Sequence, residues 1–168
     1  MTASASAALS VIDGLVTQLT IAHRAIKMNI DGVSHDESLL HPQPAGNSVN
    51  WVLGHIVTAR SRMLTFRGEP GVIDNAAMEQ YRRGSDGNVP NPLPLADLIA
   101  ALDRAQSAFI AALKRITDAE LAAKSPFPSP AGPDASLAEA LAGMVFHEAY
   151  HVGQLGLLRR LAGKGGAI

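Results

Sequence analysis

The chain has 168 residues, of which 47% are hydrophobic and 17% are charged, and its formal net charge is −1 at pH 7. This length suits one domain with a hydrophobic core, and the near-neutral charge does not favour binding to nucleic acid or to an anionic membrane surface. The chain has no cysteine, which excludes disulfides, thiolate metal ligands and a cysteine nucleophile, so any metal site must use His, Asp, Glu or water.

The N-terminus carries neither a basic leader nor a long apolar run. Residues 1–15 read MTASASAALSVIDGL, and Asp13 interrupts the apolar residues. No stretch of the chain approaches the ~18 consecutive apolar residues of a membrane span. We therefore expect a cytoplasmic protein with no signal peptide and no membrane contact.

Two segments in the first half of the chain have the three-and-four spacing of an amphipathic helix. The first carries its stripe on Leu9, Ile12, Val16, Leu19, His23, Ile26 and Ile30. The second runs from about Ser48 to Phe66 and places on one side Val52, His55, Ile56, Ala59, Met63 and Phe66. Asn47 or Ser48 can cap the start of the second helix. His35 and His41 fall in the intervening loop, where we expect them to face solvent.

Two further helices are expected in the second half. The third spans about Leu95 to Ile116, and the sequence TDAE at 117–120 has the form of a capping box, which predicts a short helix there. The four prolines in KSPFPSPAGPDA then interrupt helical structure. The fourth helix begins at Ser136, with a second capping box completed by Glu139, and runs to about Ala162. Gly163 can adopt the left-handed conformation of a C-cap.

These elements, with no segment of strand-like alternation, predict an all-α four-helix bundle formed by one domain over residues 1–168. The link from Arg67 to Pro94 is long for a connection between antiparallel neighbours. We therefore expect a crossover along the bundle between the second and third helices, with a short helix near Asn75 to Arg82.

The fourth predicted helix contains His147-Glu148-Ala149-Tyr150-His151, which matches the H-E-x-x-H motif of zinc metalloproteases. Residues four apart share a helix face, so both imidazoles can reach one metal ion. A protease of this type needs a third ligand downstream, and the chain after His151 contains no His, Asp or Glu. The longer form of the motif also fails, because Gln154 and Leu157 stand where it has Gly and His. These departures disfavour a protease.

The third ligand should then lie upstream, on another helix. His55 is the leading candidate because it lies in the apolar stripe of the second helix, beside Gly54, which permits close approach of another helix. His23, in the stripe of the first helix, is the alternative ligand or a packing residue. Without a metal, the same histidines would be hydrogen-bonded core residues or would face water at the edge of the stripe.

The segments NSVNWVLGHI (47–56) and FHEAYHVGQLGLLRRL (146–161) resemble those of the DinB/YfiT-like superfamily. The resemblance covers most of the chain and implies a four-helix bundle that holds a divalent metal through His55, His147 and His151. The residue after the first histidine varies in such families, so the protease match is accidental. Glu148 is then expected to be a solvated or salt-bridged helix residue, with a general base as the alternative.

Two nearby side chains have open roles. Gln154, one turn beyond His151, is expected to be a hydrogen-bond donor beside a ligand or a packing residue. Tyr150 could donate a hydrogen bond to a substrate.

Three neutral histidines leave at least one position on the metal open, which is typical of a catalytic site. Such a metal lowers the pKa of a bound water or thiol. Characterised relatives use mycothiol or bacillithiol, so the resemblance implies thiol-dependent S-transfer. Metal-dependent hydrolysis is one alternative, and a non-enzymatic metal-binding or stress-response bundle is another. We expect one Zn or Ni ion, with Fe or Mn allowed, a small-molecule substrate and a homodimer.

Overall fold

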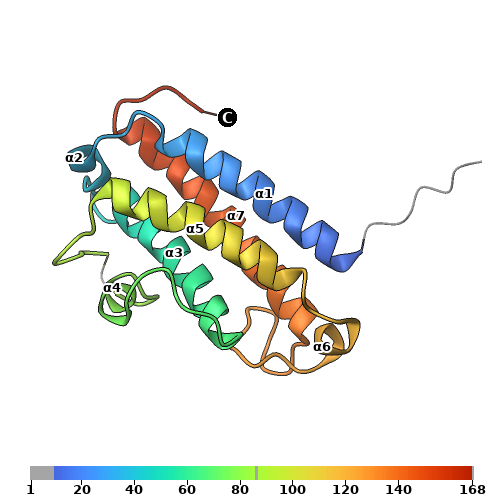
Figure 1. Ribbon diagram of the computed structural model, residues 1–168. Coiled ribbons are helices and arrows are strands. Elements are labelled where there is room, and N and C mark those ends of the chain that lie inside the picture. Colours follow the sequence, from blue (N-terminus) through green and yellow to red (C-terminus); the bar gives the residue numbers. More distant parts are fainter. Residues whose placement is uncertain (1–9, 86, 168) are drawn as a thin grey trace, which may run out of the picture.

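Four long helices build the protein, whose computed structural model describes residues 10–85 and 87–167 (Figure 1). They are α1 (Val11–Ile30), α3 (Val49–Phe66), α5 (Leu95–Leu113) and α7 (Leu137–Leu161). Three short helices lie in the connections: α2 (His35–Ser38), α4 (Asn75–Gln80) and α6 (Asp118–Ala122). The described residues form no β-strand, and an isolated bridge joins Lys124 and Ser136. The predicted all-α class is confirmed.

The helix ends follow the capping signals of the sequence. The Ser48 side chain accepts a hydrogen bond from the Trp51 amide and caps α3. The predicted capping box of Ser136 and Glu139 is present at the start of α7. Gly163 follows the C-cap of α7 with a φ of 77°, a conformation that glycine adopts without a steric cost.

Two helix boundaries and one short helix differ from the expectation. α4 ends at Gln80 rather than Arg82, and α5 ends at Leu113 rather than Ile116, because tight turns lead from it toward the α6 capping box. The segment around His35 was expected to be loop, but α2 forms there with its own capping box from Ser34 and Glu37. Leu9, the first residue of the predicted stripe, lies outside the described residues.

The crossover between α3 and α5 sets the order of the bundle. Both helices begin at the end of the bundle where α1 finishes, so α3 and α5 run parallel to each other and antiparallel to α1 and α7 (Figure 1). The chain returns along the bundle through residues 67–94, which include α4. α1 packs mainly on α7 and α3 mainly on α5, while α3 also contacts α7. The predicted crossover is confirmed, and the contact between α3 and α7 holds the candidate site.

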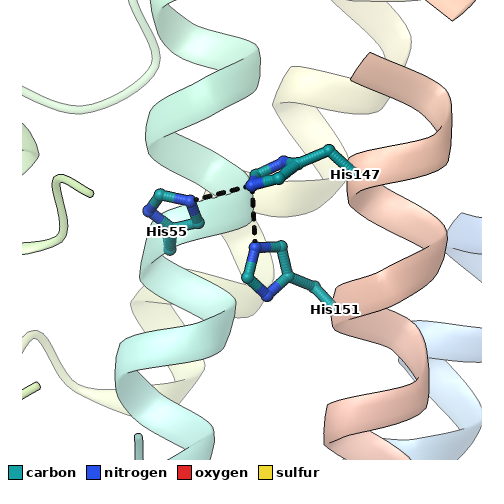
Figure 2. A group of neighbouring side chains, drawn as sticks. All are labelled: His55, His147 and His151. Atoms are coloured by element: carbon teal, nitrogen blue, oxygen red, sulfur yellow. Dashed lines mark hydrogen bonds between the residues drawn. The ribbon is translucent and has the colours of Figure 1, made fainter. Parts of the chain in front are cut away.

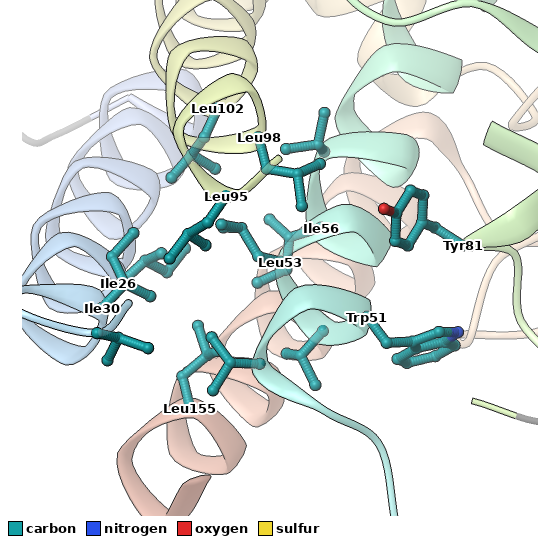
Figure 3. Packing of buried hydrophobic residues seen from close by; sticks show 14 of the residues in the cluster. Ile26, Ile30, Trp51, Leu53, Ile56, Tyr81, Leu95, Leu98, Leu102 and Leu155 are labelled. Carbon is teal, nitrogen blue, oxygen red and sulfur yellow. The ribbon is translucent and has the colours of Figure 1, made fainter. Parts of the chain in front are cut away.

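Two apolar clusters fill the interior, one at each end of the bundle. Figure 3 shows the first, in which Ile26, Leu53, Leu98 and Leu155 bring together residues of all four long helices. The second cluster is centred on Leu19, Leu64, Phe109, Leu113 and Leu141. Polar side chains lie between them along the helices: His23, Arg60, Gln106, Glu148 and His151. The core is therefore interrupted at the level of the histidines.

No helix of the described residues is long and apolar enough to cross a membrane.

Candidate metal centre

Three histidines from two helices meet beside this polar level. His55 comes from α3, and His147 and His151 come from consecutive turns of α7 (Figure 2). His147 Nε2 lies 3.4 Å from His55 Nε2 and 3.0 Å from His151 Nε2. One ring nitrogen from each residue falls within 4.8 Å of those of the other two. We call these three residues the histidine cluster; sequence analysis selected the same three.

Hydrogen bonds behind the rings fix the orientation of two of these imidazoles. His55 Nδ1 lies 2.7 Å from the carbonyl oxygen of Tyr81, and His151 Nδ1 lies 2.7 Å from Oε1 of Gln154. Because both oxygens accept hydrogen bonds, each Nδ1 carries the proton, and each Nε2 then presents a lone pair to the centre of the cluster.

The converging lone pairs fit a metal ion. Nε2 of His147 has a single proton at most, so it cannot satisfy both of its neighbours by hydrogen bonding. Two ligand nitrogens at tetrahedral angles around a zinc ion lie about 3.3 Å apart, given metal–nitrogen distances of roughly 2.0–2.1 Å. The spacings of 3.0 and 3.4 Å bracket that value. The donor set therefore suits one divalent ion, with its remaining coordination positions open.

The position of His55 depends on packing contacts around its ring. Trp51, one turn earlier on α3, stacks on the imidazole with ring centroids 4.8 Å apart and an interplanar angle of 7°. A Cβ atom on Gly54 would lie 2.3 Å from the ring of Tyr81, so only glycine lets that ring pack against α3. The close approach expected at Gly54 is thus made by Tyr81 from the crossover rather than by another helix.

All three imidazoles are held in the neutral form that binds metals. Burial lowers the pKa of His55 and of His147, and it lowers the pKa of His151 to about 4. The positive charge of Arg83 lowers the pKa of His147 further. The rings are therefore neutral near pH 7, and little proton competition opposes metal binding.

Glu148 is buried in the bundle, with 4% of its surface exposed. Its carboxylate accepts two hydrogen bonds from Arg60 of α3, from Nε at 2.9 Å and from Nη2. Of the three roles considered for Glu148, the structure shows the salt-bridged one and not the solvated one, and the general base stays a prediction. Arg60 was missed, because an apolar pattern gives no reason to place a fully buried arginine in a helix interior.

His23 takes no part in the histidine cluster. Its Nε2 lies 3.1 Å from the Asp103 carboxylate of α5. His35 and His41 are exposed, as expected: His35 Nδ1 accepts a hydrogen bond from the Leu95 amide, and His41 Nδ1 lies 2.9 Å from the Gly46 carbonyl oxygen. The alternative third ligand is therefore engaged elsewhere.

Gln154 and Tyr150 lie next to His151. Gln154 acts as the acceptor for His151 rather than as a donor, and its amide donates to the Tyr150 hydroxyl at 3.4 Å. Tyr150 is 59% exposed. Tyr150 lies outside the lining of the cleft that opens onto His55 and His147.

A cleft of about 680 Å³ opens onto His55 and His147. Its apolar lining is Ala59, Met63, Phe66, Phe127, Pro128, Pro130, Ala140 and Met144, and its polar lining includes Thr58, Thr65 and Ser129. The rings of Phe66 and Phe127 lie 5.5 Å apart, so the segment between α6 and α7 packs against the end of α3. This volume is ample for a small molecule with one end at the histidines.

The charged lining of the cleft is entirely basic. Arg62, Arg82 and Arg83 line it, and none of its described lining residues is Asp or Glu. Glu79, outside the lining, pairs with Arg62 at 2.9 Å and with Arg82 at 3.3 Å. Arg83 makes no ion pair with any carboxylate in residues 10–85 and 87–167. We call these three residues the arginine rim.

Comparison with known proteins agrees with the fold. Residues 18–155 match the DinB superfamily, and the chain therefore belongs to that superfamily. A conserved protein from Enterococcus faecalis has a similar structure, with a TM-score of 0.74 and 16% identity over 92% of this chain and 98% of its own. Among curated proteins, no match is found.

A second solved structure, YfiT from Bacillus subtilis, is described as a probable metal-dependent hydrolase with an unusual four-helix bundle topology. It gives a TM-score of 0.66 and 18% identity, and the alignment covers 98% of this chain and 95% of YfiT. At these identities the two likenesses establish the fold.

Proposed function

We propose that this protein is an enzyme that binds one divalent metal ion through His55, His147 and His151 and acts on a small molecule in the adjoining cleft. The observation that carries the proposal is the convergence of three neutral imidazole nitrogens beside a cleft of about 680 Å³, which is lined by His55 and His147. A structural site would be closed by a fourth protein ligand. His23 and Glu148, the two candidates for that position, are paired with Asp103 and Arg60 instead.

Zinc or nickel suits three imidazole ligands best, and iron or manganese remains allowed. When bound, the metal withdraws electron density from a ligand in the cleft and so lowers the pKa of a bound thiol or water. The protein's own part is to hold the three rings, to keep them neutral and to exclude water behind them. Tyr81 and Gln154 hold two of the rings, those of His55 and His151, through hydrogen bonds to their Nδ1 atoms.

We favour thiol-dependent S-transfer as the reaction. Among residues 10–85 and 87–167, no lining residue of the cleft is a carboxylate that could act as a base, and the nearby Glu148 is engaged by Arg60. A thiol, whose pKa is about 8.5, ionises without such a base when a cation is near. Its sulfur then forms a bond to an electrophilic carbon, its proton passes to solvent, and the leaving group departs with its electron pair.

Metal-dependent hydrolysis is the second candidate, and it is favoured by the description of Bacillus subtilis YfiT. The two reactions differ in their co-substrate: hydrolysis needs only water, whereas S-transfer consumes one thiol for each product formed. A cytoplasmic location and a homodimer remain predictions. We propose no nucleic-acid or membrane partner.

The test begins with metal content per chain for the wild type and for His55→Ala, His147→Ala and His151→Ala, with His41→Ala as the matched control. We expect about one equivalent in the wild type and in His41→Ala, and loss in the other three. The loaded protein is then incubated with an electrophile, with and without a low-molecular-weight thiol. Metal-dependent loss of thiol supports transfer, turnover without thiol supports hydrolysis, and a protein that takes up no metal rejects both.

A further inference from the structure

The lining of the cleft at the histidine cluster is of two unlike kinds. Its apolar residues include Met63, Met144 and Ala140. The arginine rim brings three guanidinium groups to the same space, and Glu79 is the only described carboxylate paired with any of them. The charge at the rim therefore stays positive after that pairing is counted.

Arg83 has the property expected of a ligand-binding group. Its exposed guanidinium is not neutralised by any carboxylate of the described residues. Arg62 and Arg82 are held in place by Glu79, which orients their remaining N–H groups without cancelling both charges. Arginine forks of this kind bind carboxylate and phosphate oxygens through paired hydrogen bonds.

Thr58 adds a second polar feature to the cleft. Its side chain is 2% exposed, it follows His55 by three residues, and its hydroxyl has no hydrogen-bond partner among the described residues. A buried hydroxyl without a partner costs free energy. A ligand in the cleft that accepts a hydrogen bond there would remove this cost.

We infer that the cleft binds amphipathic anions: an apolar body packs against Phe66, Phe127 and Met144, and a carboxylate on the same molecule pairs with the arginine rim. The inference rests on the proposed function in one respect: the reaction of such a substrate would take place at the histidine cluster. The binding of the anion itself needs only the cleft and its arginines.

The experiment compares two probes of nearly equal shape, 4-phenylbutyrate and its neutral amide, by calorimetric titration of metal-loaded protein. We expect the carboxylate to bind about tenfold more tightly, because charge-assisted hydrogen bonds are roughly twice as strong as neutral ones. Arg83→Gln should remove most of this preference and Arg83→Lys part of it. Arg82→Gln should have a smaller effect because Glu79 already pairs with Arg82. Arg24→Gln, on the exposed side of α1, is the control and should change nothing.

A carboxylate could instead bind directly to the metal, so the titrations are repeated with His151→Ala protein that has lost the ion. A preference that survives metal loss but disappears in the triple variant Arg62→Gln/Arg82→Gln/Arg83→Gln supports the inference, even if the protein shows no catalysis. A preference that disappears with the metal and persists in the triple variant overturns it. Equal binding of the two probes, or no saturable binding of either, also overturns it.

Discussion

Arg60 of α3 and Glu148 of α7 form a bidentate ion pair in the interior of the bundle, immediately beside the metal ligand candidate His147. Arg60 is fully buried and Glu148 is 4% exposed. Charges are expensive to bury, and the pair offsets this cost only when both partners are present. It joins the two helices that carry the histidine cluster.

Removing one partner should therefore be much worse than removing both. We expect Glu148→Ala to lower the free energy of unfolding by about 3–5 kcal/mol, because it leaves a buried guanidinium without its counter-ion. The double variant Arg60→Met/Glu148→Leu should recover most of that loss. Urea unfolding of metal-free protein measures both effects. A double variant as unstable as the single one would contradict this account of the pair.

Gly54 tests the contact that positions His55. Alanine at this position would bring a Cβ within 2.3 Å of the Tyr81 ring, and Tyr81 supplies the carbonyl that accepts from His55 Nδ1. We expect Gly54→Ala to weaken metal binding roughly 10- to 100-fold, the usual effect of losing such a hydrogen bond. Gly14→Ala on α1, where a Cβ meets nothing within 4 Å, should leave the affinity unchanged. Competition with a chelator of known affinity provides the measurement, and similar affinities in the two variants would reject the prediction.

Gln154 orients the ring of His151 through a hydrogen bond, as Tyr81 does for His55. Gln154→Leu removes the oxygen that accepts from His151 Nδ1, and we expect a loss of metal affinity of about 10- to 100-fold with little change in fold. Gln154→Glu keeps an acceptor of similar reach and should retain the affinity or improve it. The same chelator competition, with circular dichroism as the check on folding, distinguishes the two. Equal losses in both variants would mean that the amide is needed for packing instead.

The four long helices and the histidine cluster could be predicted from sequence because each depends on local pattern. Apolar spacing and capping residues define the helices, and the i, i+4 pair of His147 and His151 lies on one face in any helix. The assignment of His55 as their partner needed the family resemblance as well.

Other features could not be predicted, because they depend on which residues meet across the bundle. The burial of Arg60 and the placement of Phe127 at the cleft come from contacts between distant segments. α2 was missed for a different reason: Ser34 and Glu37 form the same capping signature seen elsewhere, but the helix is too short to show apolar periodicity.

The histidines should make the metal-free protein sensitive to acid. His151 has a pKa of about 4 in the folded state against 6.5 when unfolded, and the pKa values of His55 and His147 are also lowered. Between pH 4 and pH 6.5 the unfolded chain binds more protons than the folded chain. This contribution to the free energy of unfolding is therefore present above about pH 6.5 and is lost as the pH falls toward 4. Urea midpoints at several pH values test this. A variant with all three histidines replaced by glutamine should show a smaller decrease of the urea midpoint over that pH range. An equal decrease would mean that other titratable groups cause the loss of stability.

We predict that two copies of the chain form a homodimer through the exposed apolar face of α7. Phe146, Tyr150, Leu157 and Leu161 are 73%, 59%, 62% and 57% exposed, and their spacing places them along one face of the helix. A groove of about 340 Å³, lined in part by Gly153 and Gly156, lies beside Leu157 and can receive an apolar side chain from a second copy. A two-fold axis across this face would bury both stripes at once.

Light scattering after size exclusion should therefore show a dimer for the wild type and a monomer for Leu157→Glu. Leu40→Glu, at an equally exposed leucine outside α7, is the control and should stay dimeric. A monomeric wild type would refute the dimer itself. A dimer that persists in Phe146→Glu/Leu157→Glu would place the interface on another face, because two carboxylates buried in each stripe would oppose association there.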